Sequence, residues 1–424
     1  MKVLVLGSGG REHALVWKLR QSSRVSKLYC APGNGGIANE TECLPVDIKS
    51  LDSIVALGEK VRPDLTVVGP ELALTLGVVD EFTRRGWAVF GPTKAAAQLE
   101  WSKSFAKEFL QRHRIPTAAY AVCDSVEDVR TALTHFHFPV VVKADGLAAG
   151  KGVVIAANKE EAASVAAEMF SGRMVGDAGR RIVLEEFLKG DELSFLVLSD
   201  GERVAPLVAA QDHKRIGDGD IGPNTGGMGA YSTSDIVDEK MRDWLVNHIA
   251  RPVVAGMKAE GAEYKGVLYC GLMMTARGPM VLEFNCRFGD PETQPILMRL
   301  ESDLVEALEA SIEGRVSEGD FKWSSDASVC VVMASGGYPG TFEVGKNIVG
   351  LDAAAAVVGV QVFHAGTSKR DGEFFSAGGR VLGVTARASD LETAVQRAYE
   401  ACEKIRFEGA RYRRDIAGRA LKRS

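Results

Sequence analysis

Short apolar runs that lack alternation open the chain, and stretches with a helical period separate them. The runs are KVLVLG (2–7), KLYCAPGN (27–34), DLTVVGPE (64–71) and WAVFGPT (87–93), with a helical stretch at 11–20 after the first. Such runs are typical of parallel strands that helices bury on both faces. We therefore expect a doubly wound α/β unit. Its turns GSGG, APGN, GPE and GPT should lie at the carboxyl ends of the strands, where ligands of these sheets bind.

Longer elements with a different arrangement begin near Ser102. The pattern predicts a helix at 102–113, two strands around a glycine-rich loop in 138–156, two strands in 181–198, a hairpin in 266–285 and a helix at 303–314. Asn158, followed by Glu161 three residues later, is expected to cap a further helix. These elements indicate a second, larger unit.

A third unit is expected after residue 326. Strands are predicted at 327–335 and 380–386, and Ser389 with Glu392 has the spacing of a capping box for the helix that follows. The basic tail 411–424 is interpreted as the solvated face of a helix.

Composition and charge narrow the class of protein. The 424 residues are 46% hydrophobic and 25% charged, and the net charge of −5 gives no overall attraction for nucleic acid or an anionic membrane. No apolar run reaches membrane-spanning length, and the apolar start of the chain is too short for a signal peptide. Seven scattered cysteines without a CxxC pair argue against a zinc ribbon or a disulfide framework. We therefore expect a cytoplasmic protein with reduced cysteines.

The glycine turn after the first strand, GSGGREH, invites comparison with dinucleotide-binding proteins. Their G-x-G-x-x-G fingerprint requires glycine where Glu12 stands, and the second strand ends in Ala31-Pro32 without the acid that binds ribose. A nicotinamide-dependent oxidoreductase is therefore disfavoured. Two interpretations remain, a phosphate bound by the N–H groups of the turn and the start of the helix, or a plain tight turn.

A second glycine-rich stretch, KADGLAAGKG (143–152), joins two predicted strands. It is not a Walker A loop, because its glycine spacing is too short and Gly152 replaces the serine or threonine. We interpret it as a loop that folds over phosphates with its N–H groups and Lys151, while Lys143 brings a second ammonium group to the same place. The stretch LEEFLKGDE (184–192) is either an acidic turn or a connection whose backbone meets adenine and whose acid meets ribose.

The stretch EFNCRFGDPETQ (283–294) follows an apolar run. If that run is a strand, Glu283, Asn285 and Arg287 share one face. A carboxylate and an amide oxygen are hard ligands that suit a Mg²⁺ ion holding two phosphates. A guanidinium beside them can bind a carboxylate or steady a transferring phosphoryl group. The alternative is a polar face on an edge strand, but the polar, turn-rich continuation favours a metal site.

One more segment, QDHKRIGDGDIGPNTGGMG (211–229), is predicted to be a long loop dense in glycine and charge. Loops of this length in compact domains are usually functional, and the flanking strand signals favour that interpretation. The sequence offers no Ser-His-Asp, Cys-His or H-E-x-x-H arrangement, which disfavours covalent hydrolysis and zinc chemistry.

These motifs together resemble one family. In chain order, GSGGREHAL, APGN, VVGPE, FGPT, KADGLAAGKGV, EEFL, QDHKR, GPNTGGMGAY and EFNCRFGDPETQ resemble the phosphoribosylamine–glycine ligases (glycinamide ribonucleotide synthetases) of the ATP-grasp superfamily, over Met1 to about Ala420. The resemblance implies ATP-dependent ligation of glycine to 5-phosphoribosylamine through a glycyl phosphate, giving glycinamide ribonucleotide, ADP and phosphate in purine biosynthesis. The alternatives are another ATP-grasp carboxylate–amine ligase, a nucleotide-binding regulator without turnover and, less favoured, a nicotinamide-dependent oxidoreductase.

The resemblance also implies a division of the chain. It predicts a doubly wound amino-terminal domain at 1–102 on the side of the amine substrate, an ATP-grasp core at 103–326 and a small α/β carboxy-terminal domain at 327–424. Within the core, residues 123–190 should form a mobile lid subdomain. The implied partners are small molecules, with no nucleic acid or membrane, and a monomer in the cytoplasm is expected.

The family pattern assigns roles to individual residues. Glu283 and Asn285 would hold Mg²⁺ or Mn²⁺ on the ATP phosphates, and Arg287 would bind the glycine carboxylate or its phosphorylated form. Arg287 and Lys143 are the expected catalytic residues. The nucleotide would contact Lys103, Lys143, Gly146, Gly150, Lys151, Gly152, Glu185, Glu186, Phe187, Leu188 and Glu192. The substrates would contact Asp212, Lys214, Asn224 and Arg287, with phosphoribosylamine at Gly9, Gly10, Asn34 and Glu71. No role is assigned to the tip Asp218-Gly219-Asp220.

Overall fold

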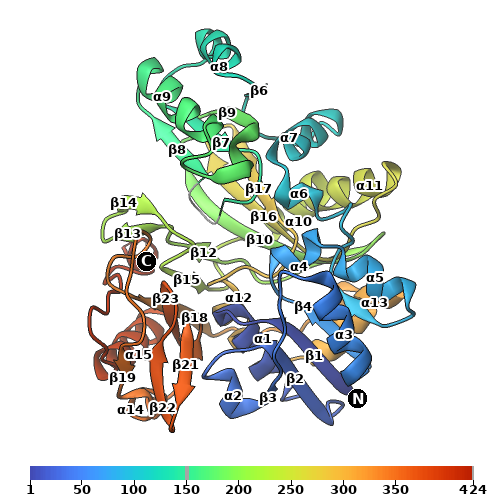
Figure 1. Ribbon diagram of the computed structural model, residues 1–424, viewed down its shortest axis with the longest axis vertical. Coiled ribbons are helices and arrows are strands. Elements are labelled where there is room, and N and C mark those ends of the chain that lie inside the picture. Colours follow the sequence, from blue (N-terminus) through green and yellow to red (C-terminus); the bar gives the residue numbers. More distant parts are fainter. Residues whose placement is uncertain (149–151, 423–424) are drawn as a thin grey trace.

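The amino-terminal strands form a parallel five-stranded sheet in the order β3-β2-β1-β4-β5 (Figure 1). The computed structural model describes residues 1–148 and 152–422. The strands are β1 (Lys2–Gly7), β2 (Lys27–Pro32), β3 (Glu42–Cys43), β4 (Leu65–Val68) and β5 (Val89–Phe90). Side chains of β1 alternate between two buried clusters, Leu4 and Leu6 in one and Val3 and Val5 in the other. Both faces are therefore covered, and the predicted doubly wound unit is confirmed.

Helices connect the strands of this sheet. They are α1 (Gly10–Leu19), α2 (Ile37–Glu40), α3 (Leu51–Val61), α4 (Glu71–Thr75) and α5 (Val78–Arg84). Helix α1 begins at the last glycine of the turn GSGG, and the N–H of its N-cap residue Gly9 donates to Glu12 Oε2 at 2.5 Å. The Glu12 carboxylate thus satisfies an N–H group at the helix start, where negative charge is favourable.

An antiparallel four-stranded sheet, β6-β9-β7-β8, stands at the top of the molecule (Figure 1). Its strands are β6 (Tyr120–Cys123), β7 (Val140–Ala144), β8 (Val153–Ala156) and β9 (Ile182–Glu186). Its helices are α8 (Val126–Ala132), η1 (Leu133–His135), α9 (Lys159–Phe170) and η2 (Gly176–Arg180). Val142, Met169 and Leu184 belong to a buried cluster that contains residues of this segment only. The Asn158 side chain accepts from the Glu161 N–H, so the predicted cap of α9 is confirmed.

A second antiparallel sheet, β11-β10-β16-β17, lies between this part and the amino-terminal sheet. Its strands are β10 (Asp191–Asp200), β11 (Val204–Pro206), β16 (Lys265–Thr275) and β17 (Gly278–Asn285), the last two forming the predicted hairpin. The helices around it are α6 (Gln98–Trp101), α7 (Lys103–Arg112), α10 (Glu239–Leu245), the π-helical turn η3 (Val246–Ala250), α11 (Arg251–Ala259), α12 (Thr293–Arg299), α13 (Leu304–Glu313) and η4 (Glu318–Asp320).

The carboxy-terminal sheet has the order β12-β15-β18-β23-β20 and takes two strands from the middle of the chain. Its strands are β12 (Gln211–Asp212), β15 (Gly229–Ser232), β18 (Ala327–Ala334), β20 (Val360–His364) and β23 (Arg380–Ala388). A small sheet of β19 (Asn347–Ile348), β22 (Glu373–Ser376) and β21 (Thr367–Arg370) and the helices α14 (Leu351–Ala355), α15 (Leu391–Lys404) and α16 (Gly418–Leu421) complete this region. Because β15 pairs with β18, segment 211–232 is built into the carboxy-terminal sheet.

The segment predicted as a long loop is largely ordered. Strands β13 (Arg215–Gly217) and β14 (Ile221–Asn224) form an antiparallel hairpin inside 211–229. Glycine and charge misled the prediction, because the hairpin is exposed at its tip and carries no apolar alternation.

Two predictions near the carboxy terminus are wrong. Helix α15 begins at Leu391, so its N-cap is Asp390, which accepts from the Thr393 N–H, and Ser389 lies one residue too early. The tail does not expose all its basic residues, because Arg413 is buried among carboxylates. Within 1–148 and 152–422, no helix is both long and apolar enough to cross a membrane.

Candidate active site

A cavity of ≈ 340 Å³ is lined by residues of both antiparallel sheets. Helix α7 and the hairpin β13–β14 contribute further lining residues. The predicted site residues that line it are Glu71, Lys103, Lys143, Gly152, Glu185, Glu186, Phe187, Leu188, Glu192, Asp212, Lys214, Asn224, Glu283, Asn285 and Arg287. The predicted residues Gly9, Gly10, Asn34 and Gly146 are not among the lining residues. Gly150 and Lys151 lie outside the described residues.

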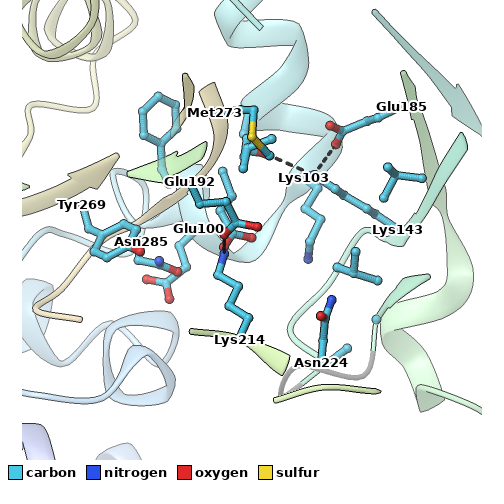
Figure 2. Close-up of a pocket in the computed structure, with 18 of the residues that line it drawn as sticks. Glu100, Lys103, Lys143, Glu185, Glu192, Lys214, Asn224, Tyr269, Met273 and Asn285 are labelled. Atoms are coloured by element: carbon cyan, nitrogen blue, oxygen red, sulfur yellow. Dashed lines mark hydrogen bonds and ion pairs between the residues drawn. The ribbon is translucent and has the colours of Figure 1, made fainter. Parts of the chain in front are cut away.

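One wall carries a buried carboxylate between two ammonium groups. Glu185, on β9, lies 2.8 Å from Lys143 Nζ through Oε1 and 2.8 Å from Lys107 Nζ through Oε2. Figure 2 shows Glu185 beside Lys143. Burial opposes ionisation of Glu185, but the two lysines outweigh it and lower its pKa. Burial also lowers the pKa of Lys107 to about 8. Lys143 donates a further hydrogen bond to the Leu282 carbonyl at 3.2 Å, which fixes its ammonium group at the floor of the cavity.

Lys103 stands at the start of α7 beside the glycine-rich loop. Its Nζ donates to the Gly146 carbonyl at 3.3 Å, and burial lowers its pKa. The Ser104 N–H donates to Asp145 Oδ1 at 2.6 Å, and the Lys103 N–H donates to the Asp145 carbonyl. The loop is thus anchored on the helix at its first residues, and Gly152 lines the cavity where the loop returns.

The oxygens predicted to hold a metal ion lie on the opposite wall. Glu283 and Asn285 are two residues apart at the end of β17, and both line the cavity. Lys214 Nζ lies 3.4 Å from Glu283 Oε1 and 3.0 Å from Glu192 Oε2. Figure 2 shows Lys214 reaching toward Glu192. Lys214, followed by Lys143 and Lys103, lowers the pKa of Glu283 to about 2, against its burial. A carboxylate that stays ionised and an adjacent amide oxygen fit a divalent cation that also binds phosphates.

Arg287 lies beyond the end of β17 but still faces the cavity. Its Nη2 is 3.0 Å from Glu100 Oε1, and its Nε is 3.4 Å from Glu71 Oε2. The Cys286 N–H donates to the other oxygen of Glu100 at 2.6 Å. Burial raises the pKa of Glu100 although Arg287 opposes the shift. The guanidinium is therefore held in one orientation by two acids.

Two further acids lie at the inner end of the cavity. Glu292 Oε1 accepts hydrogen bonds from Tyr269 at 2.9 Å and from Ser194 at 3.1 Å. Burial, followed by the Glu292 charge, raises the pKa of Asp212 well above its ordinary value. The raised pKa suits the Asp212 carboxyl group to hold a proton.

Of the residues predicted to contact the amine substrate, one lines the cavity and three do not. Glu71 lines the cavity, whereas the Asn34 amide donates to the Ser8 and His364 carbonyls at 2.9 and 2.8 Å. Asn34 Oδ1 accepts from two backbone N–H groups, so its side chain is fully hydrogen-bonded within the protein. At Gly10, an added Cβ would lie 2.7 Å from Gln294 Nε2, so glycine permits this close approach. The substrate roles of Gly9, Gly10 and Asn34 stay predictions.

Known proteins share these features along the whole chain. Three families match, each described as part of phosphoribosylglycinamide synthetase: the N domain at 1–100, the ATP-grasp (A) domain at 101–293 and the C domain at 328–419. The phosphoribosylamine–glycine ligase of Pseudomonas aeruginosa is 51% identical over 426 residues, which cover 100% of this chain and 99% of that protein. The chain belongs to the phosphoribosylamine–glycine ligase family.

Other phosphoribosylamine–glycine ligases agree with this assignment. The protein of Vibrio cholerae is 50% identical and covers 100% of this chain and 99% of its own length. The crystal structure of the ligase of Thermotoga maritima matches with a TM-score of 0.85 and 34% identity, over 98% of this chain and 100% of that one. A biotin carboxylase of Campylobacter jejuni matches with a TM-score of 0.75 at 15% identity, over 97% and 92% of the chains, and shows the fold alone. As an ATP-grasp ligase, the protein uses ATP and a divalent metal ion.

Several lining residues of this ligase were missed from the sequence, namely Glu100, Lys107, Tyr269, Asp290 and Glu292. Lys107 had a usable signal, because it follows Lys103 by four residues on one helix and therefore shares its face. Glu292 stands in the turn-rich stretch after Arg287, where no spacing rule marked it. Tyr269 belongs to an apolar strand and gave no signal.

Proposed function

We propose that the protein joins glycine to 5-phosphoribosylamine at the expense of ATP, giving glycinamide ribonucleotide, ADP and phosphate. One observation carries the proposal. Within a single cavity, Lys103 and Lys143 face the oxygen pair Glu283 and Asn285, and Arg287 lies beyond that pair. This arrangement can neutralise the terminal phosphates of a nucleotide next to a bound carboxylate.

The chemistry of the lining residues supports a position for ATP in this cavity. Lys103 and Lys143, with the loop 145–152, would contact the phosphates. The backbone of Glu186, Phe187 and Leu188 would pair with adenine, because these residues lie at the end of β9 and just after it, and they line the cavity. Glu192 would meet the ribose, and Glu185 would hold Lys143 in place.

A divalent ion would be held by Glu283 and Asn285. It would supply charge neutralisation at the β- and γ-phosphates, and either Mg²⁺ or Mn²⁺ suits this oxygen pair. Among the described residues, no group of three or more His, Cys, Asp or Glu side chains is arranged to hold a metal ion. Two protein ligands suffice where substrate phosphates and water supply the rest.

The reaction requires no protein nucleophile. A carboxylate is a poor electrophile, so its oxygen first accepts the γ-phosphoryl group from ATP, releasing ADP and forming glycyl phosphate. The amine nitrogen of phosphoribosylamine then attacks the carbonyl carbon, the phosphate leaves and the nitrogen loses a proton. Arg287 would orient the glycine carboxylate, and the departing phosphate can take up that proton.

The remaining substrate contacts follow the family pattern. Lys214 and Asn224 would complete the pocket for glycine and the amine. Gly9, Gly10, Asn34 and Glu71 would receive phosphoribosylamine near the amino-terminal sheet.

The organisation of the molecule is part of the same proposal. We propose an amino-terminal domain at 1–102, a core at 103–326 with 123–190 as its lid, and a carboxy-terminal domain at 327–424. The separate hydrophobic cluster of the upper sheet supports a lid that moves as a unit. A cytoplasmic monomer that binds no nucleic acid belongs to the same proposal, and the net charge of −5 supports its last part.

A direct assay tests the function. The protein is incubated with ATP, a divalent metal salt, glycine and freshly prepared 5-phosphoribosylamine, and glycinamide ribonucleotide is detected by mass spectrometry. We expect product and ADP in equal amounts, and no product when glycine is omitted. Binding of ATP without product would favour a nucleotide-binding regulator, and product with another acid or amine alone would favour a different ATP-grasp ligase.

A further inference from the structure

The carboxy-terminal tail holds the tip of the hairpin β13–β14. The Gly219 N–H donates to Asp415 Oδ2 at 2.8 Å, and the Arg414 N–H donates to Asp218 Oδ1 at 2.8 Å. Each of these bonds joins residues 196 positions apart in the sequence. Figure 1 shows the end of the chain beside this hairpin. The tip is therefore fixed from outside the hairpin.

Arg413 is the centre of this contact. Its side chain is only 1% exposed, and it donates to both carboxylate oxygens of Asp415 at 2.8 Å. Its Nη1 donates to Asp220 Oδ1 at 2.9 Å and to the Arg215 carbonyl at 3.1 Å. A guanidinium with this many fixed partners orients what it binds more strictly than a lysine would.

The tail itself is fixed on the carboxy-terminal domain. The Tyr399 hydroxyl, on α15, donates to the Arg413 carbonyl at 2.9 Å and accepts from the Ile416 N–H at 3.0 Å. Ile416 is buried in the core of that domain. The Ala417 N–H donates to Nε2 of the buried His213 at 3.3 Å. The tail thus connects a rigid helix to the residue that precedes Lys214.

The base of the hairpin reaches into the cavity. Thr225 donates to the Lys214 carbonyl through its N–H at 2.8 Å and through its hydroxyl at 2.9 Å. Lys214 places its ammonium group between Glu192 and Glu283, and Asn224 lines the same cavity. Arg215, whose carbonyl Arg413 binds, is the next residue. A shift of the hairpin would therefore move two cavity-lining side chains.

We propose that Arg413 is a positioning residue for the ligase reaction. Acting through Arg215 and Asp220, it holds the hairpin β13–β14 so that Lys214 and Asn224 meet glycine and the amine correctly. The inference rests on the proposed function, because it assigns the hairpin to the substrates. Within the described residues, the hydrogen bonds and ion pairs of the Arg413 side chain reach Asp415, Asp220 and the Arg215 carbonyl, and none of these three residues lines the cavity.

The test removes the contact between Arg413 and Asp220 in two ways, by a substitution in the hairpin and by a substitution in the tail. Asp220→Ala leaves the pair between Arg413 and Asp415 intact, and Arg413→Gln removes the guanidinium. We expect kcat/KM for glycine to fall about 10- to 100-fold in both, as small displacements of positioning groups do. Binding of metal-free ADP, measured by calorimetry, should stay within about twofold because its proposed contacts lie on other elements. Arg414→Ala is the matched control, since that side chain is exposed over the Tyr412 ring and its backbone bond remains.

Amide hydrogen exchange reports the hairpin directly. Peptides covering 213–225 should exchange faster in Asp220→Ala than in the wild type, while peptides of α15 stay unchanged. Wild-type kcat and KM in both variants would overturn the inference, as would equal losses of ADP binding and glycine turnover. If the wild type makes no product, the proposed function fails, and unchanged exchange in Asp220→Ala would independently refute the contact itself.

Discussion

At Glu283, three lysine side chains set the charge state of the proposed metal ligand. Lys214, Lys143 and Lys103 together lower its pKa to about 2. The carboxylate is therefore ionised at every pH at which the enzyme would be assayed, and it can bind a cation without first losing a proton. The lysines also explain how an acidic group is tolerated here before a metal ion arrives.

Replacing Glu283 by glutamine should remove the charge on which the metal ion depends. We expect ADP formation in Glu283→Gln to fall about 100-fold or more, because neutralisation of the phosphates is lost. Turnover is measured over a titration of Mg²⁺ and of Mn²⁺. Glu239→Gln, at an exposed position on α10, is the control and should match the wild type. Undiminished turnover in Glu283→Gln would refute the ligand role.

The same carboxylate predicts a dependence of stability on pH. A carboxyl group whose pKa is lowered on folding stabilises the folded state above its ordinary value of 4.5, and that contribution disappears as the pH falls toward 2. Glu283→Gln should therefore lower the urea midpoint at pH 6 and lower it less at pH 3. Urea unfolding at both pH values measures the difference in midpoint between the wild type and Glu283→Gln. A difference that is the same at pH 6 and pH 3 would contradict a lowered pKa for Glu283.

Residue types at strand ends could be read from the sequence, and their partners could not. Lys143 was selected because it ends a predicted strand, Glu283 and Asn285 because they share one face of another, and all three line the cavity. The acid that binds Lys143, Glu185, was assigned to the nucleotide. Its role between Lys143 and Lys107 depends on α7 crossing β9, which no local pattern encodes.

At the scale of elements, helix starts were predicted well where one capping residue stood alone. Asn158 caps α9 as expected. Before α15, Ser389 and Asp390 are adjacent candidates, and the spacing rule chose the wrong one. Which of the two residues caps the helix depends on where α15 begins. That start is determined by the packing of its buried residues Ala394, Ala398 and Cys402 on β18 and β23.

The corrected cap can be tested with two neighbouring substitutions. Asp390→Ala should lower the urea midpoint of unfolding, because the Thr393 N–H loses its acceptor. Ser389→Ala should leave the midpoint unchanged, since in the described part of the chain its hydroxyl bonds to the Asp390 side chain and to no helix N–H. A lower midpoint in Ser389→Ala with an unchanged midpoint in Asp390→Ala would instead support Ser389 as the cap.

At the scale of the whole molecule, one arginine links the carboxy-terminal sheet to the loop after β17. Arg380, at the start of β23, lies 3.2 Å from Asp290 Oδ2 and donates to the Gly226 and Asp290 carbonyls at 2.7 Å. These bonds join three segments that are distant in the sequence. They connect the carboxy-terminal domain to the cavity, which Gly226 and Asp290 both line.

Removing this link should weaken both stability and turnover. We expect Arg380→Ala to lower the free energy of unfolding by about 2 kcal/mol, the scale of hydrogen bonds made by a charged group. Denaturant unfolding measures that loss, and the glycine KM should rise at the same time. Arg406→Ala, at an exposed position in the same domain, serves as the control. A stable variant with wild-type KM would show that the domain is held by other contacts.

The order of the three units along the chain was predicted. The sequence did not show that a strand from the middle unit joins the carboxy-terminal sheet. The parallel amino-terminal sheet follows from its apolar runs, and β18 and β23 were found as strands. The pairing of β15 with β18 joins residues about a hundred positions apart, and sequence patterns set strand existence far better than distant pairing. The core and the carboxy-terminal domain therefore share a sheet across the predicted boundary at 326.

This shared sheet limits how the gene can be divided. A polypeptide that began at residue 327 would present β18 with one side bare, because β15 would be left on the other fragment. Bare strand edges recruit other chains, so such a fragment should precipitate when it is expressed alone. When the two fragments are co-expressed, by contrast, β15 of one can pair with β18 of the other. A split ligase that reassembles from two fragments is therefore a realistic engineering target.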